Sequence, residues 1–488
     1  MNKNSQQHFI IPEMPTEEPR STDFQVQING QEVPCLTARV SAMPFNRVWP
    51  GHERPIEQSE IASFVVFDMD KPVEIAVTVL HEFSEVVIRP LSRKISSTVE
   101  GNCIKFTIDK PDQFSLEIDG RHNNLHIFAN PIKSYETDSD VLYFGAGVHD
   151  IEKLELHSGQ TLFVDNGAVV YARTIRAYVC ENINIIGHGI IDFSRYQRTT
   201  PDLFVEEDSG SISFIRCKNI TMDGVILRDA TWWTVTAINC TNVSYNNLKL
   251  IGMWRYNADG LDFVNSENVT ISNCFVRSFD DGIVLKGVNK RRNGEYLAYY
   301  DHMNVRNYLI EHCVVWCDWG GALEIGAETV ADEYTNIVFR DCDIIHNDQG
   351  ALRIQSGDRA EIHHVIYEDI RVEYSVHDTN PALQQTDDAI YIPDNQPYVG
   401  EVIRGWMHWG IWTSGPAKFP RIHDITYKNI RILSDKGMPL PAISLYGAEE
   451  GHGFDNITIE NLYWNEEKLT ADTALLCTNE YVTNIVIC

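Results

Sequence analysis

Four short segments between residues 258 and 355 share one pattern, in which a small turn precedes a strand of alternating apolar and variable residues. They are residues 258–263, 280–286, 320–325 and 349–355. Such alternation buries one face of a strand and leaves the other face free to carry chemistry. The free face would carry Asp262, Lys286, Glu324, Arg353 and Gln355, with Asp259, Asp280 and Asp281 at the strand entries. A row of carboxylates beside basic and amide groups predicts a cleft that cleaves glycosidic bonds.

The three entry aspartates are the strongest candidates for catalysis. Asp259 and the Asp280–Asp281 pair lie about one repeat apart, so their carboxylates should converge if the repeats stack. Glycoside hydrolysis with inversion needs one carboxylic acid to protonate the leaving oxygen and a second carboxylate, about 6.5–9.5 Å away, to activate water. Like charges packed together raise at least one pKa and keep that acid protonated. Asp-Gly pairs also form turns, but two copies plus an adjacent aspartate favour catalysis.

The repeat that would position these residues begins with Asn, or a similar polar residue, followed by β-branched alternation. Its copies start at Asn182, Asn219, Asn242, Asn268, Asn307, Asn336, His364, Asp424, Asn456 and Asn484. The spacing suits a solenoid, and neither helical periodicity nor a leucine-rich consensus is present. The sequence therefore predicts a right-handed parallel β-helix, with side-chain ladders at the Asn turns. The long gap at 371–423 predicts loops inserted on one face.

Two domains are expected. Residues 136–488 would form the β-helix. In residues 1–135, runs such as 24–28, 74–79 and 114–118 alternate between turns rich in Gly, Asn, Asp and Pro. That pattern is typical of an antiparallel β-sandwich. Because solenoids need their open end covered, this domain is expected to cap the β-helix, with carbohydrate binding as an alternative role.

Composition narrows the function classes. The net charge of −29 argues against nucleic acid and anionic membranes as partners, and no stretch has the roughly 18 apolar residues needed to cross a bilayer. The N-terminal sequence lacks the apolar region of a secretory signal, which predicts a cytoplasmic protein. Five of the eleven cysteines recur at related repeat positions, which favours core packing over disulfides or zinc. These five are Cys217, Cys240, Cys274, Cys313 and Cys342.

The β-helix segment resembles glycoside hydrolase family 28, the polygalacturonases and their relatives. That family's successive motifs, Asn-Thr-Asp-Gly, Asp-Asp, Gly-His-Gly and Arg-Ile-Lys, correspond to residues 257–260, 280–281, 320–322 and 353–355. The resemblance implies that Asp280 is the general acid. It also implies that Asp259 and Asp281 hold and activate water, and that Arg353 contacts the substrate.

Two departures from the family pattern bear on the substrate. Gly321 replaces the family's His and Gln355 replaces its Lys, which weakens recognition of a sugar carboxylate because an amide supplies no charge. Glu324 would repel an anionic sugar, whereas Lys286 could compensate for that repulsion.

The N-terminal segment resembles the β-sandwich of family 49, the dextranase and isopullulanase group, in residues 87–92, 114–119 and 125–131. This second resemblance implies the same three aspartates acting on neutral α-glucans.

Aromatic residues near the motifs are candidate sugar platforms, because sugars stack their C–H faces on aromatic rings. We expect Trp254, Tyr256 and Trp409 to bind substrate together with Lys286, Glu324, Arg353 and Gln355. Trp233 and Trp316 are expected to pack in the core instead. The run at 405–412 is too aromatic for a plain loop and predicts a lid, a pocket wall or a contact between subunits.

The sequence thus predicts an inverting, exo-acting O-glycosyl hydrolase that needs no metal or cofactor and binds a carbohydrate, with a homo-oligomer left open. One alternative is a polysaccharide lyase, which would bind calcium through its carboxylates and use Arg353 or Lys286 as a base. Others are a non-catalytic carbohydrate-binding solenoid and an isomerase or transferase in which a sugar hydroxyl replaces water.

Overall fold

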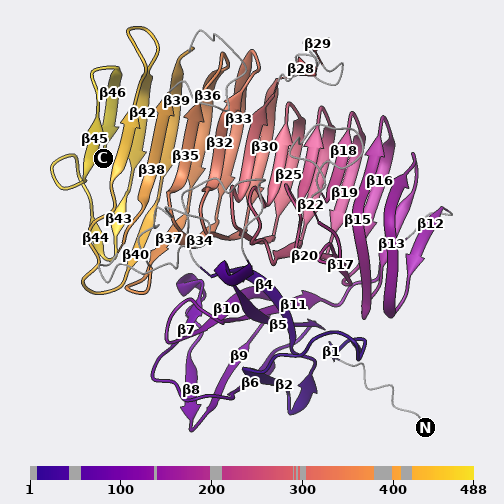
Figure 1. Cartoon of the computed structure of the whole chain (residues 1–488). Helices are drawn as coiled ribbons and strands as arrows, with labels where there is room; N and C mark the ends of the chain where they lie inside the picture. Colours follow the sequence, from indigo (N-terminus) through magenta and orange to yellow (C-terminus); the bar gives the residue numbers. More distant parts are fainter. Residues whose placement is uncertain are drawn as a thin grey trace.

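The chain is an all-β protein, with a right-handed parallel β-helix and an N-terminal β-sandwich beside it (Figure 1). This confirms the predicted fold class. The computed structural model describes residues 8–42, 56–136, 140–197, 211–288, 291–292, 295–296, 304–378, 398–407 and 420–488. Within these ranges the only helices are the short 3-10 helices η2 (Ile56–Gln58) and η3 (Leu91–Arg93), and no described helix could span a membrane.

The sandwich consists of two sheets whose apolar faces share one core. The alternating runs of the sequence appear as β2 (Phe24–Ile28), β6 (Val73–Val79) and β10 (Asp112–Ile118), and β2 shows strict alternation of buried and exposed residues. The six-stranded sheet contains β1 (Phe9–Ile10), β4 (Leu36–Ser41), β5 (Ser59–Met69), β7 (Val86–Arg89), β10 (Asp112–Ile118) and β11 (Leu125–Pro131). The five-stranded sheet contains β2 (Phe24–Ile28), β3 (Gln31–Val33), β6 (Val73–Val79), β8 (Ser97–Glu100) and β9 (Cys103–Ile108).

Three parallel ladders form the faces of the β-helix, and two of them join at its start through the long strands β13 (Gly147–Leu156) and β15 (Ala168–Tyr178). The first ladder contains β12 (Val141–Phe144), β14 (Thr161–Val164), β16 (Glu181–Ile186), β19 (Lys218–Asp223), β22 (Thr241–Asn246), β25 (Glu267–Ser272), β30 (Val305–Glu311), β33 (Glu333–Arg340), β36 (Glu361–Glu368), β39 (Ile422–Lys428), β42 (Phe454–Glu460) and β46 (Val482–Ile487). The second continues from β15 through β18 (Ile212–Ile215), β21 (Val235–Ile238), β24 (Leu261–Val264), β27 (Ile283–Gly287), β32 (Gly321–Thr329), β35 (Gly350–Ser356), β38 (Glu401–Met407), β41 (Ile443–Tyr446) and β45 (Leu476–Thr478). The third contains β17 (Ile190–Asp192), β20 (Ile226–Arg228), β23 (Lys249–Ile251), β26 (Phe275–Ser278), β31 (Val314–Cys317), β34 (Asp343–Asn347), β37 (Arg371–Tyr374), β40 (Arg431–Ser434) and β43 (Tyr463–Trp464), followed by the antiparallel β44 (Glu467–Lys468). A separate hairpin pairs β28 (Arg291–Arg292) with β29 (Glu295–Tyr296).

The polar residue that opens each repeat forms a ladder along the first face, as predicted. All ten of these residues adopt positive φ, a left-handed conformation that Asn tolerates better than most residues. The amide of Asn219 donates to Asn182 at 2.9 Å, and the pattern continues through Asn242, Asn268 and Asn307 with distances of 2.8–3.1 Å. This ladder fixes the register of successive coils and hence of the candidate site.

The recurring cysteines lie inside the β-helix. All five are buried with free thiols in the hydrophobic core that runs through the coils. Core packing is therefore their role, as the sequence analysis favoured.

The sandwich packs along the side of the β-helix, whereas the sequence predicted a cap over its open end (Figure 1). An apolar cluster joins Phe64 and Phe128 of the sandwich to the third ladder, to which Ile226 of β20, Phe275 of β26 and Trp316 of β31 belong. Their outward side chains are as apolar as those of the core, so the strands of this ladder are buried on both sides. The sandwich thereby covers the face next to the one that carries the candidate site.

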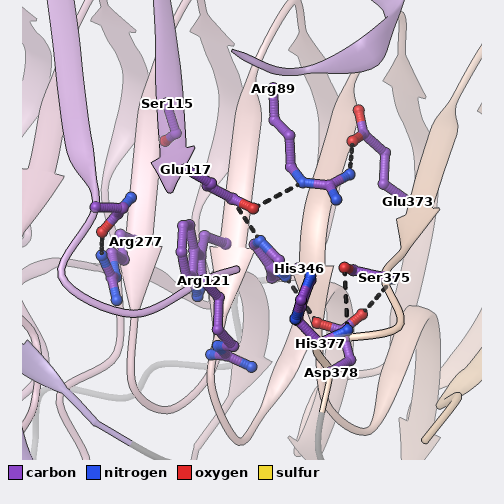
Figure 2. A network of polar contacts seen from close by, with 12 residues as sticks. Arg89, Ser115, Glu117, Arg121, Arg277, His346, Glu373, Ser375, His377 and Asp378 are labelled. Atoms are coloured by element: carbon purple, nitrogen blue, oxygen red, sulfur yellow. Dashed lines mark hydrogen bonds and ion pairs between the residues drawn. The ribbon is translucent and has the colours of Figure 1, made fainter. Parts of the chain in front are cut away.

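A buried ionic network crosses this interface (Figure 2). Arg89 of β7 contacts Glu117 at 3.0 Å and Glu373 of β37 at 2.6 Å, and its guanidinium is 2% exposed. His346 of β34 lies between Glu117, at 2.6 Å, and Asp378, at 2.9 Å. Although burial opposes it, these two carboxylates raise the pKa of His346. Burial raises the pKa of Glu373 to about 7 against the opposing charge of Arg89.

Replacing Arg89 with Met is expected to lower the free energy of unfolding by about 3–5 kcal/mol, because two buried carboxylates lose their partner. Chemical denaturation of the whole chain measures the effect. Arg176→Met is a matched control, since Arg176 pairs on the surface with the 65% exposed Glu155 and should cost less than about 1 kcal/mol. Equal losses in the two variants would show that the interface network contributes little.

Candidate active site

Consecutive strands of the second ladder position the candidate residues. The register pairs Asp262 of β24 with Val284 of β27, Val284 with Glu324 of β32, and Glu324 with Arg353 of β35. These side chains point away from the helical core, as the alternation predicted. Asp262 and Glu324 are nevertheless fully buried, because neighbouring side chains cover this face.

Lys286 lies at the centre of the carboxylate cluster. Its Nζ is 2.8 Å from Asp259 Oδ2, 3.1 Å from Asp262 Oδ1 and 3.2 Å from Asp281 Oδ2. The same ammonium lies 4.0 Å from the ring centroid of Trp233, which adds a cation–π contact. The three carboxylates raise the pKa of Lys286 despite its burial, so it stays charged. The sequence placed Lys286 among the substrate contacts. In the structure its ammonium contacts Asp259, Asp262 and Asp281.

The adjacent aspartates Asp280 and Asp281 have opposite pKa shifts. Burial and the neighbouring Asp281 raise the pKa of Asp280 to about 8. Burial also disfavours the charge of Asp281, but Lys286 and Arg353 outweigh it and lower the pKa of that carboxyl. Two neighbouring carboxyls held in opposite protonation states form an acid–base pair at neutral pH.

The pKa of Asp259 is also raised. Burial raises its pKa well above the ordinary value, and Asp262, Asp280 and Asp281 add to the effect while Lys286 opposes it. Burial, with a contribution from Asp281, raises the pKa of Asp262 to about 7 against the opposing charge of Lys286. One ammonium cannot neutralise three buried carboxylates, so the cluster retains protons.

Glu324, Arg353 and Gln355 form a second group beside Asp281. Arg353 Nε lies 3.0 Å from Glu324 Oε1, and Arg353 Nη2 donates to Gln355 Oε1 at 2.6 Å. Arg353 is only 13% exposed and Gln355 is buried. Both cations of the described centre, Lys286 and Arg353, are therefore already engaged by protein groups.

The aromatic candidates differ in accessibility. Trp254 is buried and donates through Nε1 to Asp229 at 3.0 Å, and Tyr256 is buried against Trp319 with ring centroids 5.5 Å apart. Trp233 and Trp316 are buried, as predicted. Trp409 lies outside the described residues. Within the described part of the 405–412 run, Trp406 of β38 is 36% exposed and carries Arg404 over its ring at 4.5 Å.

Sequence reasoning placed Asp262 on the free face without giving it a role, and it did not identify Arg121. Asp262 stood in the repeated motif, and its place on the free face was the available signal for its contact with Lys286. The sandwich residue Arg121 forms a buried ion pair with Asp318, in the turn that leads to Gly320 and Gly321. No sequence signal links residues so far apart in the chain.

Comparisons with known proteins bear on the family and on the fold. Residues 158–385 match the model of glycosyl hydrolases family 28, which confirms the resemblance of the β-helix to that family. No curated protein sequence matches the chain. Dex49A from Penicillium minioluteum has a similar structure, with a TM-score of 0.66 at 13% identity, over 98% of this chain and 96% of that chain. A polygalacturonase from Erwinia carotovora ssp. carotovora is similar over 69% of this chain and 86% of that chain, with a TM-score of 0.50 at 19% identity.

The two structural likenesses show the fold, and the first extends over the sandwich as well as the β-helix. The family match over residues 158–385 supports a polygalacturonase-like glycoside hydrolase.

Proposed function

We propose that the protein is an inverting glycoside hydrolase that works without a metal ion. The observation that carries this proposal is the opposite protonation of two adjacent carboxyls, Asp280 with a pKa of about 8 and Asp281 with a lowered pKa. The ammonium of Lys286 occupies the space among Asp259, Asp262 and Asp281 that a cation would need. This arrangement favours hydrolysis over a calcium-dependent lyase.

In the proposed reaction, Asp280 gives its proton to the glycosidic oxygen as the bond to the anomeric carbon breaks. Water attacks that carbon from the opposite side, and its proton passes to Asp281, with Asp259 helping to hold the water. The sugar gains the hydroxyl in inverted configuration. Exchange of protons with solvent then restores Asp280 as the acid and Asp281 as the base.

The state of these carboxyls predicts a bell-shaped pH profile. The acid must be protonated, so kcat/KM should fall as pH rises through about 8, the pKa of Asp280. The base must be ionised, so activity should also fall on the acid side, at a pH below the ordinary aspartate value because the pKa of Asp281 is lowered. Initial rates across pH check the prediction, and activity that persists far above pH 8 would remove Asp280 as the acid.

For the substrate, we propose a neutral sugar at the cleavage point. Lys286 is held by aspartates, and Arg353 is engaged by Glu324 through Nε and by Gln355 through Nη2, so both charges are already partly compensated before a uronate carboxylate could pair with them. A panel of uronate and neutral α-linked oligosaccharides tests this directly. Faster cleavage of oligogalacturonates than of every neutral substrate would contradict it.

Exo action is a further proposal, which rests on the long insertions between repeats. Product sizing on an intact polymer distinguishes exo action, which releases only short products, from endo action, which lowers the polymer length at once. An unsaturated product that absorbs in the ultraviolet would indicate a lyase instead. Binding without turnover would indicate a carbohydrate-binding solenoid, and products larger than the substrate would indicate a transferase.

A further inference from the structure

Glu324 is a buried carboxyl for which the proposed reaction gives no role. It lies on β32 between Val284 of β27 and Arg353 of β35, and it is fully buried. One oxygen, Oε1, lies 3.0 Å from Arg353 Nε. The other, Oε2, lies above Gly321, where an added Cβ would come within 2.3 Å of it.

The same turn holds Asp281. The backbone N–H of Gly321 donates to Asp281 Oδ1 at 3.2 Å, and a Cβ on Gly320 would lie 2.4 Å from that oxygen. The second oxygen, Oδ2, faces Lys286 at 3.2 Å. The two glycines therefore allow both carboxyls to approach the turn closely, and neither position has room for a side chain.

Glu324 and Asp281 approach the same turn, and a hydrogen bond between them requires a proton on one of the two because two carboxylates offer only acceptors. Burial raises the pKa of Glu324 well above its ordinary value, and Asp281 adds to the effect against the opposing charges of Arg353 and Lys286. Two further charged groups lie near these residues. Arg404 of β38 interacts electrostatically with Glu324 and Arg353, and Asp280 interacts with Arg353. Of the two carboxyls, Glu324 therefore holds a proton more readily, since its pKa is raised while that of Asp281 is lowered.

We propose that Glu324 is a positioning residue that fixes the carboxylate of Asp281 through a donated hydrogen bond, and that Gly321 lacks a side chain because Glu324 fills its space. The inference rests on the proposed function, in which Asp281 receives the proton of water. It also accounts for the departure from the family motif, since a His at position 321 would collide with Glu324.

Two substitutions of Glu324 by side chains of similar size distinguish its hydrogen bonding from its space filling. Glu324→Gln keeps a donor for Asp281 and an acceptor for Arg353, so kcat should stay within about threefold of the native value. Glu324→Leu removes both, and kcat should fall roughly 100-fold with KM nearly unchanged. The acid limb of the pH profile should move upward only in the Leu variant, because Asp281 loses the donor that lowers its pKa. Thermal unfolding of both variants confirms that they are folded.

A second pair tests the fit at Gly321. Gly321→Ala alone should lower kcat by displacing Glu324, whereas the same change in a Glu324→Ala background should add little further loss. If the losses of kcat caused by Gly321→Ala and Glu324→Ala simply multiplied in the double variant, the two side chains would not compete for the same space.

Other outcomes overturn the inference. A raised KM with unchanged kcat in either Glu324 variant would show that Glu324 contacts the substrate. If Glu324→Leu had the kcat, KM and pH profile of the native protein, Glu324 would have no positioning role. If the native protein hydrolyses no sugar, the proposed function fails, and infrared difference spectra still test Glu324. At neutral pH the native protein should show a protonated-carboxyl band that Glu324→Gln loses, and an unchanged band would refute the proton on Glu324.

Discussion

Replacing Asp280 with Asn is expected to lower kcat about 1000-fold, because a general acid contributes some 10²–10⁴ to the rate and an amide cannot supply its proton. The protein should stay folded, since the carboxyl of Asp280 is already largely protonated at neutral pH, with a pKa of about 8. Steady-state kinetics on the best oligosaccharide of the panel measures the loss.

An activated aryl glycoside provides the internal control for this variant. Its leaving group departs without protonation, so the Asp280→Asn variant should recover most of its rate on that substrate. Asp281→Asn should recover nothing, because its missing function is the activation of water. Equal losses on both substrates in the Asp280 variant would contradict its role as the acid.

Replacing Lys286 with Met is expected to cause the second large effect, on stability. The change leaves Asp259, Asp262 and Asp281 around an apolar side chain, and removal of one partner from a buried ion pair typically costs about 3–5 kcal/mol. Chemical denaturation at neutral pH measures the cost. Activity should fall too, since the pKa of Asp281 rises when its main cation is lost.

Lys218→Met is the matched control, because Lys218 pairs with Glu181 at 3.5 Å on the surface, where such pairs contribute less than about 1 kcal/mol. The Lys286→Met variant should also regain stability at lower pH, where protons neutralise the aspartates that it leaves unpaired. A variant as stable as the control at neutral pH would show that Lys286 does not hold the cluster together.

The β-helix could be predicted from the sequence because its signal is local and repeated. Asn182, Asn219 and the other repeat openers combine a left-handed backbone with a side chain that reaches the next coil, and few other residues do both. The same register placed Asp259 one coil from Asp281, and the structure brings them to a common ammonium.

The burial of Lys286 and Glu324 could not be predicted in this way. Alternation shows on which side of a strand a residue lies, but not whether neighbours such as Trp233 cover that side. The lateral position of the sandwich was missed for a related reason. Phe275 and Trp316 face the sandwich, yet they are as apolar as the residues of the helical core, so the sequence does not distinguish the two faces.

The configuration of the first product tests the central claim most directly. Proton NMR of a reaction with an α-linked oligosaccharide, recorded before mutarotation, distinguishes the two anomers. An acid and a base on opposite sides of the sugar predict that the β-anomer appears first. First appearance of the α-anomer would contradict the proposed mechanism, because retention requires a covalent intermediate in place of the direct attack of water.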